Sequence, residues 1–331
     1  MVGPDGLPQF GTSTGRFLKV DFSQLQGAYR HSALTQFLRT KRWVYQFIAT
    51  PELAMLWAIV DVGYSSNAFA TVVHLESGRV LADLSQLGLP RPAVHVSDET
   101  GVQTAAHFRM PGVSLAAYQN SGQAYFNSSL KTRDLEGEAR LLTAEAAPFL
   151  AVVAPVEGHG VNVTHKHAAL KSFGWVDVQG QRFSLDGGVG GLDFTNGILA
   201  RETSWRWGFA CGRLPDGTPV GFNLVEGFNE SRDDVNENAA WVGNQLFPLG
   251  RARFEWNKSD VLERWHVRTT DGSLEMEFTP IAVHREFRDL KLVKSHFQQP
   301  IGRWNGVLTL DGKTISLSQV AGVTEDQQVR W

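Results

Sequence analysis

Polar residues that could do chemistry gather between Thr164 and Asn238, a segment that is also rich in tryptophan. Asp193 is an isolated acid in this segment, between Leu192 and Phe194. A carboxyl group buried among apolar neighbours has a raised pKa and can donate a proton. A short acidic side chain can equally cap a turn by bonding to nearby backbone. The sequence leaves both roles open for Asp193.

Two histidines, His165 and His167, lie two residues apart, which places both on one face of a strand. This spacing can suit a metal, with a third ligand from Asp193 or Glu226. No cluster of cysteines or carboxylates supports such a site. Acid or base chemistry by either histidine is the stronger expectation, because imidazole titrates near neutral pH. We therefore expect neither a metal nor another cofactor.

The run 204–211 has the alternation of a strand. Trp205, Trp207 and Phe209 share one face, as the walls of an apolar cavity or part of a core would. Arg206 points to the other face, among small side chains. A guanidinium in that position can pair with a carboxylate or stack on an aromatic ring.

Glu226 follows Phe222 and Leu224 on one face of a second strand. A carboxylate among apolar neighbours costs free energy unless it is paired, and Arg206, Lys166 or a histidine could be its partner. The acids and bases predicted for the site are Asp193, His165, His167 and Glu226. The residues expected to contact a ligand are Trp205, Arg206, Trp207, Phe209, Phe194, Asn223, Glu237 and Asn238.

Short strand-like runs dominate the rest of the chain. The best helical candidate is Ser23–Thr40, in which Thr35–Arg39 could form a separate short turn. Ser273–Thr279 alternates between apolar and acidic residues, as a half-buried antiparallel strand does. Three Asp-Gly pairs, at 216–217, 271–272 and 311–312, each separate two strand-like runs and predict hairpins.

This pattern predicts an all-β, mostly antiparallel fold with a few short helices. Open sheets rarely exceed about ten strands before they curl or split, so two barrel-like or sandwich domains are expected. A stretch with two prolines and two glycines, 146–160, suggests the boundary. The predicted units are an N-terminal segment, 1–40, that packs on the barrels, a first β domain, 41–155, and a second, 156–331.

The composition of the chain bears on which kinds of partner and which cellular location to expect. Hydrophobic residues make up 42% of the 331 residues, charged residues 20%, and the net charge is -3, so nucleic acid is not an expected partner. Cys211 is the one cysteine, which fits a reducing compartment. Neither a secretory signal nor a run long enough for a membrane span is visible. A cytoplasmic location is the expectation.

Short motifs in a defined order carry a family resemblance. They are Lys41-Arg42-Trp43, Asp61-Val62-Gly63-Tyr64, Thr164-His165-Lys166, Leu192-Asp193 with Gly197, Thr203 with Trp205-Arg206-Trp207, Gly221-Phe222-Asn223-Leu224, Glu237-Asn238-Ala239 with Trp241, and Glu325 with Arg330-Trp331. From about Lys41 to the C-terminus, the chain resembles a bacterial family of unknown function, DUF2804. That family is more distantly similar to the group of hydroxyneurosporene synthase, a carotenoid hydratase, tocopherol cyclase and AttH-like proteins.

The resemblance implies two lipocalin-like β-barrel domains with a cavity between or within them. Members of the wider group hydrate or cyclise apolar polyenes by protonation, some catalyse pericyclic ring closure, and others only bind lipids. The hydratases carry an Asp-His-x-x-Gly pattern followed by tryptophans. Here Asp193 and Gly197 match that pattern, whereas Phe194 replaces the histidine. His165 or His167 is a candidate for the missing basic group.

The function expected on these grounds is binding of an apolar, unsaturated small molecule of polyene, isoprenoid or fatty-acyl type. As a hydratase, cyclase or isomerase, the protein would use Asp193 as the acid and the π faces of Trp205 and Trp207 to stabilise a cation. Glu226 or a histidine would steer water or take back the proton.

Two other functions remain open at this point. One is a non-catalytic lipid carrier of lipocalin type, and the other is a carbohydrate-active β-sandwich, for which a convincing pair of acids is missing. For both the enzyme and the lipid carrier, the expected partner is the apolar small molecule itself. Transient contact with a membrane is a route by which this ligand could be exchanged.

Overall fold

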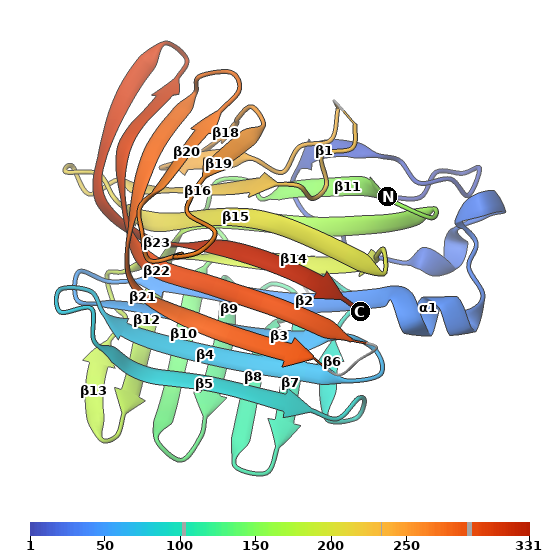
Figure 1. Ribbon diagram of the computed structural model, residues 1–331, viewed down its shortest axis with the longest axis horizontal. Helices are drawn as coiled ribbons and strands as arrows, with labels where there is room; N and C mark the ends of the chain where they lie inside the picture. The colour runs from blue at the N-terminus through green and yellow to red at the C-terminus, as the bar shows by residue number, and fades with distance from the viewer. Residues whose placement is uncertain (101–103, 233, 290–292) are drawn as a thin grey trace.

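The computed structural model describes residues 1–100, 104–232, 234–289 and 293–331. Within these residues the chain forms two curved antiparallel sheets, seen as the blue-to-green and the yellow-to-red strands of Figure 1. The prediction of an all-β, mostly antiparallel fold with two barrel-like units is confirmed. None of the described helices is long and apolar enough to cross a bilayer.

The first sheet has fourteen strands among the described residues. They are β1 (Gly11–Thr14), β2 (Thr40–Ala49), β3 (Leu53–Asp61), β4 (Ser66–His74), β5 (Val80–Gly88), β6 (Val94–Val96), β7 (Thr104–Met110), β8 (Val113–Gln119), β9 (Tyr125–Lys131), β10 (Leu135–Leu142), β11 (Leu150–Val156), β12 (Gly160–Val178), β13 (Gln181–Ser184) and β14 (Val189–Ile198). The hydrogen-bonded order is β5-β4-β3-β2-β14-β12-β10-β9-β8-β7-β6, with β11 and β13 also on β12 and β1 on β11. The sheet curls until β6 packs on β3, and its apolar inner face forms a closed core.

The second sheet has nine strands in the same described part of the chain. They are β15 (Glu202–Arg213), β16 (Pro219–Glu226), β17 (Ala239–Val242), β18 (Gln245–Pro248), β19 (Ala252–Glu255), β20 (Trp265–Thr269), β21 (Leu274–Asp289), β22 (Lys294–Leu310) and β23 (Lys313–Arg330). Their order is β18-β17-β16-β15-β23-β22-β21-β20-β19, and β19 returns to pack near β16. A separate core fills the inside of this half-barrel.

Local sequence explains the hairpins and the faces of these strands. The three Asp-Gly pairs connect β15 to β16, β20 to β21 and β22 to β23, so the predicted hairpins are confirmed. In β21, Leu274, Met276 and Phe278 are buried in the core of the second sheet, while Glu275 is exposed. The alternating pattern therefore sets which face is buried.

The helical prediction is wrong over most of its length. The α-helix α1 spans Ala33–Arg39, and only the 3₁₀ turns η1 (Phe22–Gln24) and η2 (Gly27–Tyr29) precede it. Gly27 has a positive φ of 58°, which breaks a helix, and the Ser32 hydroxyl accepts from the Thr35 amide to start α1 afresh.

The change of sheet occurs between Ile198 and Glu202. The boundary expected at 155/156 instead falls at a hairpin inside the first sheet, because β11 and β12 are directly paired there. The glycines of 146–160, Gly158 and Gly160, lie at that hairpin, while Pro155 is within β11 and Pro148 precedes it. β14, the last strand of the first sheet along the chain, is followed at once by β15, an inner strand of the second sheet between β16 and β23.

The two sheets pack face to face along β2, β12 and β14 on one side and β15, β16 and β23 on the other. Glycines permit the close approach. A Cβ at Gly221 of β16 would collide with the carbonyl oxygen of Ala168 in β12, and one at Gly191 of β14 would collide with the ring of Phe209. Phe209 and Phe47 belong to a third core, shared between the sheets. A cavity lined in part by residues of this shared core lies beside it.

Candidate functional site

A cavity of about 330 Å³ lies between the two sheets. Its walls come from β2–β5, β12 and β14 of the first sheet and from β15, β16 and β21–β23 of the second. Most of the lining is apolar, and its aromatic members are Trp43, Tyr45, Tyr64, Phe69, Trp205, Trp207, Phe228, Phe297 and Trp331. Such a space suits a small apolar ligand with a few fixed polar contacts.

Three tryptophans at one end of the cavity are fixed by hydrogen bonds from their indole N–H groups. Trp43 donates to Asp193 Oδ2 at 3.3 Å, and Trp205 donates to Glu325 Oε1 at 2.7 Å. Trp207 donates to Oδ1 of a buried asparagine, Asn223, at 2.7 Å. Indole has a single donor. What these rings offer a ligand is therefore their π surface.

The same end holds a buried charge cluster centred on Lys166. Its Nζ lies 2.7 Å from Asp193 Oδ1 and 3.5 Å from Glu237 Oε2, and all three residues are at most 6% exposed. Burial lowers the pKa of Lys166, but the two carboxylates outweigh this effect and the pKa is raised. Burial also raises the pKa of Glu237. One ammonium thus faces two acids.

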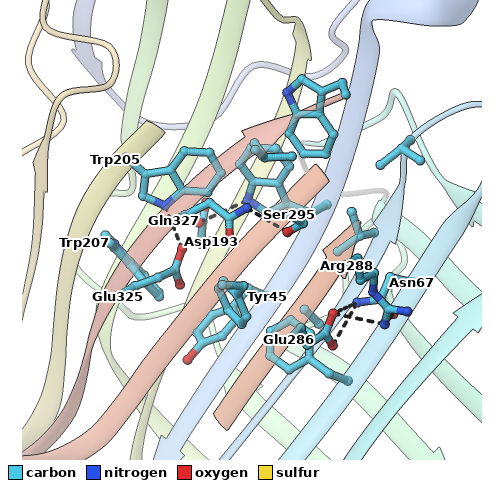
Figure 2. Close-up of a pocket in the computed structure, with 18 of the residues that line it drawn as sticks. Tyr45, Asn67, Asp193, Trp205, Trp207, Glu286, Arg288, Ser295, Glu325 and Gln327 are labelled. Atoms are coloured by element: carbon cyan, nitrogen blue, oxygen red, sulfur yellow. Dashed lines mark hydrogen bonds and ion pairs between the residues drawn. The ribbon is translucent and has the colours of Figure 1, made fainter. Parts of the chain in front are cut away.

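Glu325 of β23 lies beside this cluster, between the indoles of Trp205 and Trp207 and the ring of Tyr45 (Figure 2). Trp205 donates to Oε1 and Gln299 Nε2 donates to Oε2 at 2.6 Å. Burial raises the pKa of Glu325 to about 7, although both hydrogen bonds lower it. A carboxyl group with this pKa can exchange a proton with a ligand near neutral pH.

The opposite end of the cavity has a second polar cluster, shown at the right of Figure 2. Glu286 accepts from Asn67 Nδ2, from Ser85 Oγ and from Arg288 Nη2. His284 Nε2 lies 3.4 Å from the same carboxylate. These bonds connect β4 and β5 of the first sheet to β21 of the second.

Four of the residues predicted from the sequence line the cavity: Asp193, Trp205, Trp207 and Glu237. They come from β14, from β15 and from the loop before β17. Asp193 is buried in the ion-paired cluster and caps no turn.

The two histidines lie outside the cavity. They are on the face of β12 opposite to Lys166, where His165 Nε2 accepts from the Phe17 amide and its ring stacks on Phe194. His167 Nε2 is bound to Ala147 O at 3.0 Å. Burial lowers the pKa of both imidazoles to about 3. They are neutral, backbone-held core residues, and no group of three or more metal-ligating side chains occurs among the described residues.

Glu226 and Arg206 also lie outside the cavity, as partners of each other at 3.3 Å. Strand alternation explains this position, because Glu226 shares its face with Phe222 and Leu224, which point into the core of the second sheet. Arg206 lies near the Trp256 ring on that same side.

The remaining residues predicted to contact a ligand lie behind the cavity wall. Phe194 follows Asp193 on a strand and so points to the opposite face, into the core of the first sheet. Phe209 packs between the sheets on Phe47, and neither phenylalanine lines the cavity. Asn223 holds Trp207, and Asn238 Oδ1 accepts from the Val225 amide.

Several cavity residues were missed in the sequence, among them Trp43, Tyr45, Lys166 and Glu325. Register explains the omission, because Asp193 lies directly opposite Tyr45 on one side and Lys166 on the other. A signal did exist for Glu325, an acid that follows the apolar run of β23. The Tyr45 hydroxyl is buried and makes no hydrogen bond within the described part of the chain.

Comparison with known proteins gives a family and a fold. No curated protein matches the chain. The structure of CghA with Sch210972 is similar, with a TM-score of 0.56 and 12% identity over 88% of this chain and 89% of that one. Kievitone hydratase from Nectria haematococca has a TM-score of 0.51 and 10% identity over 97% and 98%. At these identities, the likeness shows a shared fold alone.

The family model described as Domain of unknown function (DUF2804) matches residues 1–331, which extends the resemblance in the motifs to the N-terminal segment. The chain therefore belongs to the DUF2804 family.

Proposed function

We propose that this protein binds an apolar, unsaturated small molecule between its two sheets and protonates it, which leads to hydration, cyclisation or isomerisation. The observation that carries the proposal is Glu325, a buried carboxyl group whose pKa is raised to about 7 at the end of an apolar, indole-walled cavity. Acids of this kind protonate weakly basic substrates near neutral pH.

The reaction balances without a cofactor. The Glu325 carboxyl gives its proton to one carbon of a C=C bond, which leaves a carbocation and a carboxylate. Water can add to the cation and lose a proton to the carboxylate, or a second C=C bond can attack the cation before an adjacent proton is lost. In both routes Glu325 is protonated again at the end.

The cation would be stabilised by its surroundings. The π faces of Trp43, Trp205 and Trp207 attract positive charge, and the Lys166 cluster has one more carboxylate than ammonium. Asp193, predicted as the acid, lies 2.7 Å from Lys166 Nζ. We assign the proton to Glu325 instead, because its two partners are neutral donors.

The comparisons support this proposal at the level of fold. The kievitone hydratase shares the architecture over 97% of this chain, and its name states a hydration. This makes a hydratase-type reaction a reasonable first choice of assay.

The test uses binding and turnover side by side. cis-Parinaric acid, a fluorescent tetraene, reports binding, while farnesol, retinol and linoleic acid are incubated with the protein in ²H₂O and analysed by mass spectrometry. We expect a product with carbon-bound deuterium from at least one compound. Glu325→Gln should abolish the deuterium label and retain cis-parinaric acid binding. Asp193→Asn is the comparison, and turnover that survives in Glu325→Gln but not in Asp193→Asn would return the acid role to Asp193.

A non-catalytic lipid carrier is the second candidate, favoured by the largely apolar lining itself. It predicts that lipid extracted from the purified protein is chemically unaltered and that all three compounds are recovered without deuterium. Such a lining offers few partners to sugar hydroxyls, so nothing in it favours the carbohydrate-active alternative.

A further inference from the structure

The two ends of the cavity differ in charge. At one end Lys166 faces Asp193 and Glu237, with Glu325 beside them, so carboxyl groups outnumber the single ammonium. An anionic group is disfavoured there, since like charges in a buried site repel strongly. A ligand with a charged end would therefore turn that end away from the Lys166 cluster.

At the other end, Arg288 contributes a guanidinium that is only partly engaged. Its Nη2 donates to Asn67 Oδ1 at 3.3 Å, to Ser85 Oγ at 3.0 Å and to Glu286 Oε2 at 3.2 Å. Its Nε and Nη1 have no hydrogen-bond partner among the residues that the structure describes. The Arg288 side chain is 27% exposed, so these hydrogen bonds fix its position while part of the guanidinium stays accessible to a ligand.

The nearby carboxylate does not cancel this charge for a ligand. Glu286 is only 9% exposed at its side chain, and its oxygens accept from Asn67, Ser85, Arg288 and His284. Burial lowers the pKa of His284, but hydrogen bonds to Asp83 and Glu286 outweigh this and raise it to about 9, so the imidazole is cationic near neutral pH. The cations Arg288 and His284 thus flank the Glu286 carboxylate, both of whose oxygens already accept hydrogen bonds. The further acid, Asp83, has a 41% exposed side chain.

A second cavity lies near this end. It is an open groove of about 840 Å³, and it shares Arg288, Ser295 and Val329 with the apolar cavity. The other basic residues on its walls, Arg206, Lys294 and Arg330, are each paired with an acid, namely Glu226, Asp289 and Glu202. Alternate residues of β15, β22 and β23 line the groove and the apolar cavity, so the two lie on opposite faces of the second sheet and meet at its end, beside Arg288. Among the described residues, Arg288 is the one basic side chain that lines both.

We propose that the ligand is amphipathic and that Arg288 binds its anionic end group, a carboxylate or a phosphate, where the apolar cavity meets the groove. The inference rests on the proposed function, since it names the class of molecule that the same cavity takes. The apolar chain lies between the sheets, and its distal part, with the reacting double bond, reaches Glu325. Arg288 thereby fixes which end of the ligand meets the acid.

Guanidinium groups bind carboxylates and phosphates through charge-assisted hydrogen bonds, which are about twice as strong as neutral ones. An alcohol of the same chain length fills the same apolar space without this interaction. The difference between the two ligands therefore measures the end-group site alone.

The experiment is competition against 1-aminoanthracene, a neutral fluorescent probe, by dodecanoic acid, dodecyl phosphate and dodecanol. In the natural chain we expect at least one anion to bind about tenfold more tightly than dodecanol, as one charge-assisted contact gives. Arg288→Gln should remove this preference and leave dodecanol affinity within about twofold. Arg288→Lys, which keeps a charge, should retain part of it.

The control variant is Arg303→Gln, because Arg303 lines neither cavity and donates to Gln319 O at the surface. It should leave all affinities unchanged. Equal binding of acid, phosphate and alcohol by the natural chain, or an anion preference that survives in Arg288→Gln, would overturn the end-group site while the proposed function stands. Failure of all three compounds to displace the probe would overturn both. Preference for one anion over the other tells carboxylate from phosphate.

Discussion

Lys166 Nζ lies 2.7 Å from Asp193 Oδ1, and the two residues are direct partners across β12 and β14. This ion pair is almost free of solvent and faces the apolar cavity between the sheets. Burying charges costs free energy that a close partner must offset. A buried pair at the wall of a cavity is weak evidence for stability and stronger evidence for a site.

Removal of the ammonium should be costly. Lys166→Met leaves Asp193 and Glu237 as buried carboxylates without a counter-ion, and we expect a loss of about 3–5 kcal/mol in the free energy of unfolding. Urea denaturation measures it. Lys131→Met is the control, because its pair with Glu136 is exposed and should be worth under about 1 kcal/mol.

A triple variant separates charge from packing. Lys166→Met combined with Asp193→Asn and Glu237→Gln has no net charge to compensate. We expect it to recover most of the lost stability. If the triple variant is as unstable as Lys166→Met alone, the cost comes from packing and not from unpaired charge.

Glu325 should make stability depend on pH. Its pKa is raised from 4.5 to about 7 in the folded chain, so the native state holds a proton that the unfolded state has lost between these values. Stability from this group is therefore complete below about pH 4.5 and declines as pH rises to about 7, by about 3 kcal/mol. Glu325→Gln should abolish this decline.

The measurement is the free energy of unfolding of both proteins at about pH 4.5 and about pH 8. Other groups titrate in both proteins, so the difference between them isolates Glu325. A difference that does not change across this range, or that changes in the opposite direction, would show that Glu325 has no raised pKa.

The fold and one wall of the candidate site could be predicted from the sequence. Strand alternation placed Trp205 and Trp207 on one face, and both line the cavity. Asp-Gly pairs predicted three hairpins of the second sheet, and the alternation of Ser273–Thr279 predicted a half-buried strand, because both signals are local. The resemblance in short motifs led to the family that the whole chain belongs to.

The opposite wall of the cavity, around Trp43, could not be predicted from the sequence. Trp43 lies beside Trp205 with ring centroids 6.1 Å apart, although the two residues are 162 positions apart in the sequence. Which strand faces which depends on how two curled sheets pack, a non-local property that no alternation pattern contains. The same limit applies to His165 and His167. The sequence showed that both lie on one face of their strand, but it did not show whether that face is the one that lines the cavity.

The contact between the sheets should tolerate no added methyl group at Gly221. A Cβ there meets the carbonyl oxygens of Ala168 and Ala210, which are backbone atoms and cannot rotate away. Gly221→Ala should lower the free energy of unfolding by about 3 kcal/mol or more. Gly212→Ala is the matched control, since its Cβ would meet a side-chain methyl of Val320 at 3.0 Å. Equal losses in both variants would contradict a special role for Gly221.

His284 should stabilise the contact between the sheets in a pH-dependent way. Its pKa is raised from 6.5 to about 9, since hydrogen bonds to Asp83 and Glu286 outweigh burial, which lowers it. The stability it adds is complete below about pH 6.5 and is lost as pH rises through about 9. The advantage of the natural chain over His284→Gln should fall by about 3 kcal/mol across that range. Denaturation at about pH 6 and about pH 10 measures it, and a constant advantage would refute the charged imidazole.

Two tryptophans allow the acid site to be tuned by one hydrogen bond. Trp205 donates to Glu325, whereas Trp207 donates to Asn223, and both rings line the cavity. Trp205→Phe removes a donor that lowers the pKa of Glu325, so the pKa should rise further, by about one unit for a bond to a charged group. Trp207→Phe removes a comparable indole but leaves that bond in place, so its effect on the pKa should be small. The carboxyl ¹³C shift of Glu325 followed by NMR against pH gives both values without any substrate. Equal shifts in the two variants would mean that the apolar environment alone, and not the Trp205 hydrogen bond, sets the acidity of Glu325.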